Sequence, residues 1–366
     1  MSSQIVEIKR FLTRKCAMQG IPVSGTFELT PRCNLRCKMC YIRLTPEQMA
    51  SIGTERSAKE WIDFAKKCVD AGMAFLLLTG GEPTLRKDFC EIYSQLATMG
   101  ISISINTNGT IITDEIKALW DKYPPAQVNV TLYGSCREDY ENLCGNPDAF
   151  DAVVDALEWL QSHSILVHLN TTITPENYMH LEEIEQFAKN RGLELRVTSY
   201  CFPPTRREGC DSCKSFARLD PELAGELIVK DLLIREGKEA VKFRAANLAN
   251  PVQKSCDLDN GEPMACLAGK SQFWVTWDGR MTPCGMMDMP AFYPFKDDFD
   301  TAWQGLKSAC DNIRLCPECV GCEEAKSCMN CAAVTYAETG RFDGKPEYMC
   351  KLNRAYRNAV TKAAKD

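Results

Sequence analysis

Short apolar runs alternate with segments of helical periodicity along the first 200 residues. Six runs predict buried strands, at 25–30, 75–79, 101–106, 128–133, 166–172 and 193–200. Between them, apolar positions recur every three or four residues and predict helices at 58–71, 88–99, 114–120, 149–161 and 177–190. Strands that alternate with helices in this way form right-handed βαβ units and a parallel sheet. Six repeats favour an α/β fold with a partial (β/α)6 barrel similar to a TIM barrel.

The alternation ends near residue 200, at a turn-rich segment, 201–209. A connecting helix is predicted at 220–237, a β-hairpin at 273–280 and a basic amphipathic helix at the tail. We therefore divide the chain into five parts. They are an N-terminal extension (1–24), the barrel (25–219), a connecting helical segment (220–255), a small cysteine-rich domain with a hairpin and short helices (256–350), and a C-terminal helix (351–366).

The composition excludes several classes of protein. The 366 residues carry a net charge of −6 without a basic block, which argues against a nucleic-acid partner. No apolar run approaches the roughly 20 residues that cross a bilayer, so no membrane association is expected. The 21 cysteines do not suit a secreted disulfide scaffold, because their number is odd and the first 20 residues lack the apolar core of a signal peptide. Metal-bound thiolates in a reducing cytoplasm fit better.

Three cysteines, Cys33, Cys37 and Cys40, form a CxxxCxxC run directly after the first predicted strand. Three thiolates on one loop can hold three irons of a 4Fe–4S cubane and leave the fourth iron open to a ligand. A CxxC half also occurs in zinc sites. The second strand ends in Gly80-Gly81-Glu82-Pro83, where glycines would let a ligand approach the backbone and the glutamate could accept from an ammonium group. The alternative for this segment is a plain turn from strand to helix.

These two motifs, one βα unit apart, resemble the radical S-adenosylmethionine (radical SAM) superfamily. The resemblance implies that the open iron binds S-adenosylmethionine and that an external ferredoxin or flavodoxin supplies one electron. Cleavage would yield a 5′-deoxyadenosyl radical, which abstracts hydrogen from a substrate in an oxygen-sensitive reaction. Implied contacts to S-adenosylmethionine are Gly80, Gly81, Glu82, Pro83, Tyr41, Ser104, Asn106, Thr131 and Asn170. The last four are equally suited to capping turns and helices.

The C-terminal cysteines allow two interpretations. Paired CxxC units could form zinc ribbons. Their order, Gly279xxxxCys284, Cys319xxCys322xxxxxCys328 and a late Cys350, instead resembles the SPASM domain and implies two auxiliary 4Fe–4S clusters, three in all. The first auxiliary set would be Cys266, Cys284 and Cys331, with a fourth position that is open or filled by Cys256. The second auxiliary set would be Cys319, Cys322, Cys328 and Cys350.

Other cysteines have weaker assignments. The spacing Cys328xxCys331 is one residue shorter than in the family, and Cys316 has no counterpart there. Cys210 and Cys213 are either structural or linked to substrate. The remaining thiols in helix or loop segments are interpreted as small apolar residues: Cys68, Cys90, Cys136 and Cys144.

The SPASM resemblance implies modification of a peptide or protein side chain, by a thioether or carbon–carbon crosslink or by oxidation, during ribosomal peptide maturation. Only about two dozen residues precede the first strand, so a built-in leader-binding domain is not expected. A separate leader-peptide recognition protein, direct binding of the leader or a non-peptide substrate would then be needed. The aspartate base of the sulfatase-maturing branch is replaced by Gly285, which leaves Asp288 as the candidate base. The alternatives are a small-molecule substrate (a sugar, amino acid or cofactor precursor) and a non-enzymatic iron–sulfur electron carrier.

Overall fold

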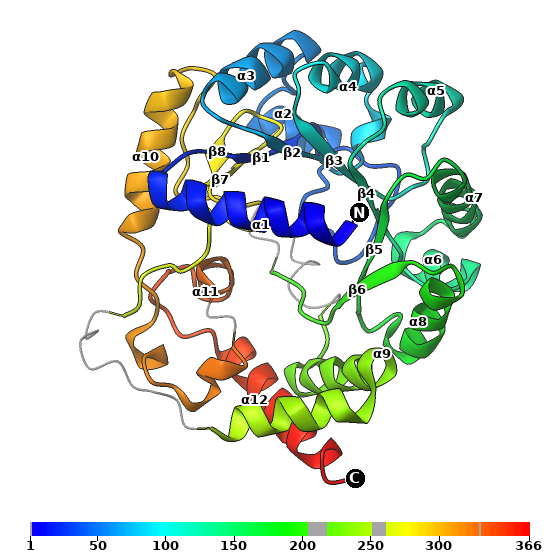
Figure 1. Cartoon of the computed structure of the whole chain (residues 1–366), viewed down its shortest axis with the longest axis vertical. Coiled ribbons are helices and arrows are strands. Elements are labelled where there is room, and N and C mark those ends of the chain that lie inside the picture. Colours follow the sequence, from blue (N-terminus) through cyan, green and yellow to red (C-terminus); the bar gives the residue numbers. More distant parts are fainter. Residues whose placement is uncertain (1, 204–217, 251–260, 329–330) are drawn as a thin grey trace.

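One curved sheet of eight strands organises the computed structural model, which describes residues 2–203, 218–250, 261–328 and 331–366 (Figure 1). The strand order is β6-β5-β4-β3-β2-β1-β7-β8. The first six strands pair in parallel and confirm the predicted partial barrel. They are β1 (Ser24–Glu28), β2 (Phe75–Thr79), β3 (Ser102–Thr107), β4 (Gln127–Thr131), β5 (Val167–Thr172) and β6 (Glu194–Thr198).

Helices cover the outer face of this sheet (Figure 1). All five predicted helices are present: α3 (Ala58–Asp70), α4 (Phe89–Ala97), α5 (Asp114–Lys122), α7 (Ala149–Ser162) and α8 (Leu181–Asn190). The 3-10 turns η1 (Pro83–Leu85) and η2 (Tyr178–His180) precede α4 and α8, and the sequence did not predict α2 (Pro46–Ile52) or α6 (Arg137–Cys144). Ser57 and Thr45 begin α3 and α2 with capping boxes, which satisfy their first backbone N–H groups.

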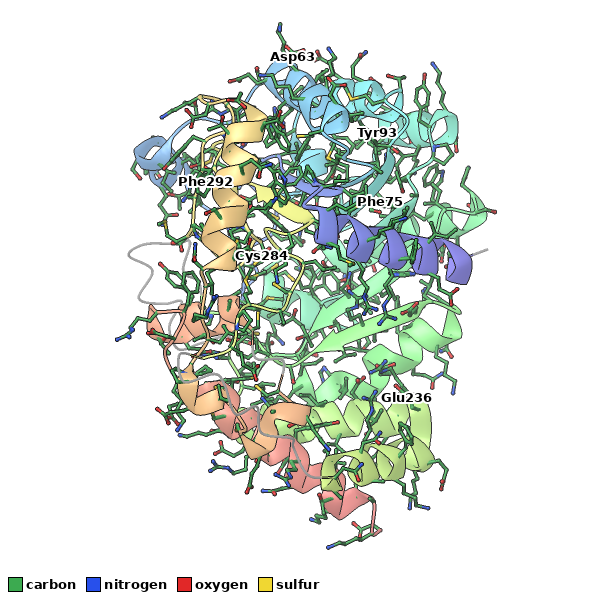
Figure 2. All side chains as sticks on the ribbon, turned by 60° about the vertical axis from the view of Figure 1, so that its left-hand side comes forward. Asp63, Phe75, Tyr93, Glu236, Cys284 and Phe292 are labelled. Carbon is green, nitrogen blue, oxygen red and sulfur yellow. The ribbon has the colours of Figure 1, made fainter. Side chains whose placement is uncertain are left out.

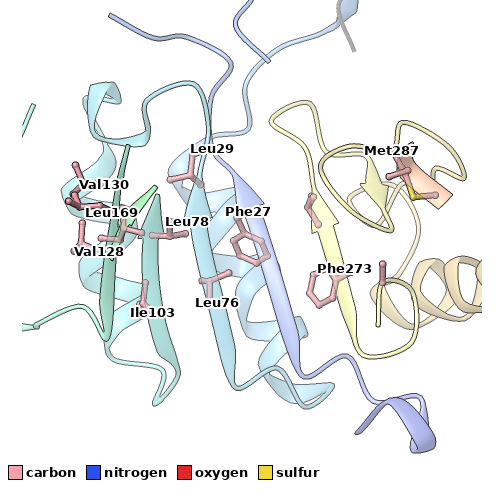
Figure 3. Close-up of a cluster of buried hydrophobic side chains, with 14 of the residues drawn as sticks. Phe27, Leu29, Leu76, Leu78, Ile103, Val128, Val130, Leu169, Phe273 and Met287 are labelled. Carbon is pink, nitrogen blue, oxygen red and sulfur yellow. The ribbon is translucent and has the colours of Figure 1, made fainter. Parts of the chain in front are cut away.

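The two faces of the barrel sheet differ in chemistry because successive side chains of a strand point to opposite sides. The outer face is apolar, and Phe27, Leu78 and Leu169 on it are fully buried against the helices (Figure 3). The inner face is polar and partly exposed; it carries Ser104, Asn106, Asn129, Thr131, His168 and Asn170. The barrel interior can therefore receive a polar ligand.

A helix that the sequence did not predict, α1 (Ser2–Gln19), lies across the barrel in front of the sheet (Figure 1). Its Lys9 Nζ lies 5.1 Å from the centre of the Phe75 ring, at the first residue of β2. Burial lowers the pKa of Lys9. Helix α1 thus covers the end of the barrel where the strands begin.

The predicted C-terminal hairpin is present as β7 (Gln272–Val275) and β8 (Met281–Thr282). Strand β7 also pairs in parallel with β1, from Ser24 opposite Gln272 to Phe27 opposite Val275. The barrel sheet therefore continues into the cysteine-rich segment (Figure 3). Helix α10 (Phe299–Asp311), which was not predicted, covers β7: the Phe273 ring centre lies 5.5 Å from that of Phe299 and 6.1 Å from that of Trp303.

Two long helices lie at the opposite end of the molecule. Helix α9 (Pro221–Ala249) includes the predicted connecting helix and is broken at Gly237, whose φ of 81° is left-handed. Helix α12 (Glu347–Ala363) begins before the predicted tail helix and packs along α9, so closely that a Cβ at Gly225 would lie 2.4 Å from the Leu352 carbonyl. Between β8 and α12 lie α10, η4 (Pro317–Cys319), η5 (Glu323–Lys326) and α11 (Ala332–Thr339). Within the described ranges, every helix is too short or too polar to cross a lipid bilayer.

Candidate metal and cofactor sites

The three thiols of the cysteine loop (residues 33–40) lie close together beyond the end of β1. Burial raises the pKa of the Cys33 thiol to about 12, and the negative charges of Glu82, Cys37 and Cys40 raise it further. The three thiols share one short loop, so their charges act on one another. Cations such as iron would offset the repulsion among three thiolates.

Hydrogen-bond donors point at the sulfur atoms of this loop. The Leu35 N–H lies 3.4 Å from Cys33 Sγ, and the Arg43 N–H lies 3.2 Å from Cys40 Sγ. The side-chain amide of Asn108 donates to Cys33 Sγ at 3.6 Å and to Asn34 Oδ1 at 2.9 Å. Such donors stabilise cluster-bound thiolates and tune their potential. The donor set of the loop therefore fits a cluster with three cysteine ligands.

Cys37 has a second thiol as its neighbour, which the sequence did not predict. A hydrogen bond with Cys144 is the main reason that the pKa of Cys37 is lowered, and Tyr133 contributes another. Cys144 is the last residue of α6, and its carbonyl accepts from Arg36 N at 3.0 Å. Cys144 is thus more than a small apolar residue, because it holds the cysteine loop against α6. A lone helical cysteine gives no sequence signal for this contact.

The Gly80–Pro83 segment is hydrogen-bonded directly to the start of the cysteine loop. Gly81 N donates to Thr30 O at 2.7 Å, and Glu82 N donates to Arg32 O at 2.8 Å. A Cβ at Gly80 would lie 2.6 Å from Thr30 O, and one at Gly81 would lie 2.3 Å from Arg32 O. The two glycines are therefore needed for the approach of another backbone segment, whereas the sequence suggested the approach of a ligand. The two motifs form one connected unit.

Glu82 is fully buried and accepts four hydrogen bonds from the chain itself. Its Oε1 accepts from Thr84 N and Oγ1 and from Thr107 Oγ1, at 3.1, 2.6 and 2.8 Å. Its Oε2 accepts from Asn108 N at 2.7 Å. Burial raises the pKa of this carboxyl and the hydrogen bonds oppose the rise. The side chain therefore joins the ends of β2 and β3, and a contact with an ammonium group stays a prediction.

The four strand residues proposed to contact S-adenosylmethionine share the inner face of the sheet. Asn106 Oδ1 accepts from Asn129 Nδ2 at 2.8 Å, and Thr131 is paired in register with Asn170. Asn106 and Thr131 lie at the carboxyl ends of β3 and β4, whereas Ser104 and Asn170 lie further inside their strands. Tyr41 directly follows the cysteine loop, and Pro83 is buried at the start of η1.

The described members of the first auxiliary set, Cys266, Cys284 and Cys331, influence one another's charge. Burial raises the pKa of Cys284 to about 12, and the charges of Cys331 and Cys266 add to the rise. Burial likewise raises the pKa of Cys310 to about 12, with contributions from Cys266 and Cys284. Cys284 lies beside the lower end of α10 (Figure 2). Cys256 lies outside the described residues, as do Cys210 and Cys213.

The second auxiliary set also converges, and Cys316 joins it. Burial raises the pKa of Cys319 to about 12, followed by the charges or hydrogen bonds of Cys316, Cys350 and Cys328. Cys350, on α12, interacts in turn with Cys328 and Cys322. Among the described cysteines, every thiol is free of disulfide bonds. No group of three or more His, Cys, Asp or Glu side chains in the described ranges is arranged to hold a single metal ion.

The position after the hairpin cysteine has no room for an aspartate. A Cβ at Gly285 would lie 2.7 Å from the ring of Trp274, whose Nε1 donates to the buried Glu28 at 3.0 Å. The Oδ1 atom of Asp288 is buried without a hydrogen-bond partner. The Asp288 side chain also interacts with Tyr336, whose pKa is raised chiefly by burial. A buried carboxylate oxygen of this kind is available to a proton or a ligand.

A family model described as the radical SAM superfamily matches residues 27–188. An AdoMet-dependent heme synthase from Methanosarcina barkeri is 25% identical over 336 residues, which cover 89% of this chain and 95% of that protein. The subtilosin biosynthesis protein AlbA of Bacillus subtilis is 27% identical over 181 residues, 49% of this chain and 39% of AlbA.

Two solved structures share the fold. SuiB of Streptococcus suis, bound to S-adenosylmethionine, aligns over 91% of this chain and 78% of its own, with a TM-score of 0.66 and 18% identity. The protein anSMEcpe with bound AdoMet aligns over 94% of this chain and 100% of its own, with a TM-score of 0.66 and 16% identity. These likenesses confirm the open partial barrel with its cysteine-rich C-terminal part.

Proposed function

We propose that this chain, a member of the radical SAM superfamily, holds a 4Fe–4S cluster at Cys33, Cys37 and Cys40. When bound, the cluster would supply the electron for reductive cleavage of S-adenosylmethionine and thereby hydrogen abstraction from a substrate. One observation carries this assignment. The three thiols lie together, with N–H donors on Cys33 and Cys40, in a loop bonded to the Gly80–Pro83 segment.

The residues around the loop hold its geometry. Arg86 is buried; its guanidinium donates to Leu29 O at 2.8 Å, just before the loop, and pairs with Asp88 through two hydrogen bonds. Arg32 binds Glu55 through two hydrogen bonds of 2.8 Å. These ion pairs limit the movement of the segment that delivers the cysteines. Orientation of a bound cofactor against its substrate is the protein's main contribution to such a reaction.

The assignment is tested by replacing Cys33, Cys37 and Cys40 together by alanine in anaerobically prepared protein. We expect the variant to form no 5′-deoxyadenosine from S-adenosylmethionine after reduction, because the loop has lost its sulfur ligands. A matched control replaces Cys16, Cys90 and Cys136, three partly buried thiols elsewhere, and should retain the activity. Cleavage by the triple loop variant would refute the site. If the unmodified protein also formed no 5′-deoxyadenosine, the electron-carrier alternative would stand.

The first and second auxiliary sets are proposed to hold one 4Fe–4S cluster each, which makes three clusters in the chain. Their support is the convergence of the described cysteines in two separate groups. Thiolates of this kind suit iron–sulfur clusters as well as zinc. Anaerobic protein should therefore contain about twelve irons, four for each cubane. An external one-electron reductant of the ferredoxin or flavodoxin class is required.

For the substrate, we propose a peptide or protein side chain. AlbA acts in subtilosin biosynthesis by its name, and SuiB has been solved with its precursor peptide SuiA. The proposed products are a thioether or carbon–carbon crosslink or an oxidised residue, and a separate leader-peptide recognition protein is a proposed partner. The unpartnered carboxylate oxygen of Asp288 supports this residue as the candidate base. The steric contact between Gly285 and Trp274 argues against a base at position 285.

A small-molecule substrate is the second candidate, and one observation favours it. The similarity to the heme synthase of Methanosarcina barkeri extends over nearly the whole of both chains, whereas that to AlbA covers about half of this chain. Cofactor precursors of the heme class are therefore the small molecules to try first.

One experiment separates the two substrate classes. Reduced enzyme with S-adenosylmethionine is incubated in parallel with iron coproporphyrin and with cysteine-rich candidate peptides, and the products are followed by mass spectrometry. A mass change of a peptide that depends on both reductant and S-adenosylmethionine supports the first candidate. Conversion of the porphyrin alone would replace it with the second. The triple loop variant serves as the control in both arms.

A further inference from the structure

The segment 174–180, between β5 and α8, is joined to the cysteine loop by contacts that neither sequence motif includes. One contact is direct: Lys38 Nζ, in the loop, lies 3.1 Å from Glu176 Oε1. The Glu176 side chain is only 15% exposed, so this ion pair is largely shielded from solvent. The neighbouring Asn177 is fully buried and donates to Tyr133 O, just beyond β4, at 3.0 Å. The segment is thus fixed to the barrel and holds the loop by a charge.

The second contact runs through α6. His180 Nδ1 lies 2.5 Å from Asp139 Oδ1, and the other oxygen of Asp139 accepts from Ser135 N at 2.7 Å. The Asp139 side chain is 1% exposed. Gly134 leaves space for it, because a Cβ there would lie 2.0 Å from Asp139 Cβ. A carboxylate buried in this way depends on its partners, since an unpaired buried charge is strongly destabilising.

The far end of α6 holds the backbone of the cysteine loop. Arg36 N donates to Cys144 O and Lys38 N donates to Leu143 O, both at 3.0 Å. The last carbonyls of a helix have no partner within it, so the loop satisfies groups that α6 would otherwise leave open. A helix of eight residues is marginal on its own, and its position depends on such contacts. A displacement of α6 would therefore be passed to the loop through these two hydrogen bonds.

We propose that the segment 174–180 positions the cysteine loop for its bound cofactor, with Asp139 and Glu176 as the two positioning residues. The inference rests on the proposed function, which assigns a cluster to this loop. Neither residue ligates the cluster. Glu176 acts through the Lys38 side chain, and Asp139 acts through α6, whose start it fixes to the segment and whose end binds the loop. Two separate contacts thereby tie the loop to one rigidly held stretch of chain.

The test compares Asp139→Ala with Asp139→Asn in the full chain, reconstituted anaerobically. The alanine variant should keep its iron but show a weaker change in the electron paramagnetic resonance spectrum when S-adenosylmethionine is added. Formation of 5′-deoxyadenosine should fall by on the order of 100-fold, the cost of an ångström-scale misplacement. Asparagine keeps the shape of the side chain and can still accept from Ser135 N, so it should restore most of the spectral change.

Asp231→Ala is the matched control, because it separates positioning from stability. Asp231 is also a buried carboxylate, and it pairs with Arg235 through two hydrogen bonds within α9. Both alanine variants should unfold at lower urea concentrations than the wild type, but only Asp139→Ala should alter the response to S-adenosylmethionine. A wild-type spectral response in Asp139→Ala would leave Asp139 with a purely structural role and overturn the proposal.

Glu176→Gln tests the direct contact, and it decides the question alone if Asp139→Ala does not fold. The variant keeps the size of the side chain but loses the charge that pairs with Lys38. The affinity for S-adenosylmethionine, measured by titrating the spectral change, should therefore fall. Glu182→Gln is the control, since its ion pair with Lys230, at 2.9 Å, joins α8 to α9 instead. Wild-type affinity in the Glu176 variant would contradict the proposal.

Alkylation of the metal-free chain separates failure of this inference from failure of the proposed function. Cys33, Cys37 and Cys40 should react faster with iodoacetamide in Asp139→Ala than in the wild type, because the loop is held less firmly. Cys90, a partly buried thiol on α4, is the internal control and should react at the same rate in both. A wild-type chain that bound no cluster at the loop would refute the proposed function and leave this difference in place. Equal alkylation rates at the loop would refute the positioning role alone.

Discussion

Single residues at the cysteine loop are constrained by the backbone that surrounds them. Gly80 and Gly81 could be identified from the sequence as special positions, and the structure changes the reason: it is the carbonyls of Thr30 and Arg32 that exclude a Cβ. The ligand cysteines were predictable because their spacing is local. Asn108 and Cys144 were not, because each reaches its sulfur neighbour through tertiary contacts.

Replacing Gly81 by alanine tests this constraint. The new methyl group would lie 2.3 Å from Arg32 O, and we expect the overlap to lower the free energy of unfolding by about 1–3 kcal/mol and to reduce iron content. Urea denaturation and iron analysis of anaerobic protein measure both effects. Gly53→Ala is the control, since its added carbon would meet only Asp278 Cβ at 3.6 Å. Equal stability of the two variants would contradict the steric explanation.

At the scale of elements, the sequence predicted the barrel strands and their helices well, because strict alternation and helical spacing are strong signals. Helix α1 lacked such a signal: Ile8, Phe11 and Met18 are exposed by 57%, 63% and 89%, so its apolar residues do not mark a buried stripe. Helix α10 did carry one, since Phe299, Trp303 and Leu306 recur at helical spacing after the N-cap Asp298.

The contact between α8 and α9 predicts a pH dependence. Burial and a hydrogen bond to Asp231 raise the pKa of Glu185 to about 8, against the charge of Arg235. Arg235 pairs with Asp231 through two hydrogen bonds of 2.9 and 2.5 Å, and Lys230 pairs with Glu182 nearby. Because the pKa of Glu185 in the folded state exceeds the unfolded value of 4.5, protonation of this carboxyl stabilises the folded state. The stabilisation is complete below about pH 4.5 and is lost as the pH rises toward 8.

The variant Glu185→Gln keeps a hydrogen-bond donor but cannot ionise. We expect its free energy of unfolding to change less between pH 6 and pH 9 than that of the wild type, and to exceed the wild-type value at pH 9. Glu194→Gln is the control, because Glu194 is exposed at the start of β6. A wild-type slope in the Glu185 variant, measured by urea titration at each pH, would reject the assignment.

At the scale of the whole molecule, the barrel and the cysteine-rich part, which the sequence analysis separates, share one sheet. The sequence predicted the hairpin but not its partner, because pairing of β7 with β1 joins residues about 250 positions apart and leaves no local pattern. Arg218 adds a second connection: it packs on Tyr348 of α12 and pairs with Glu338 of α11.

Unfolding should therefore be cooperative across both parts. Separating β7 from β1 would expose the Phe27 and Phe273 side chains and the edge of the sheet, so we expect one calorimetric transition. Tryptophan fluorescence should report the same midpoint, since Trp61 lies in the barrel and Trp303 on α10. Two separate transitions would show that the parts fold independently.

The pairing of β7 with β1 also restricts how a substrate can enter. The C-terminal part shares main-chain hydrogen bonds with the barrel, so the two cannot open by a hinge motion. Helix α1 covers the end of the barrel where the strands begin. A substrate must therefore enter the barrel interior past the loops at the carboxyl ends of the strands. The distance between Cys33 and Cys284 should therefore be the same with and without a bound substrate.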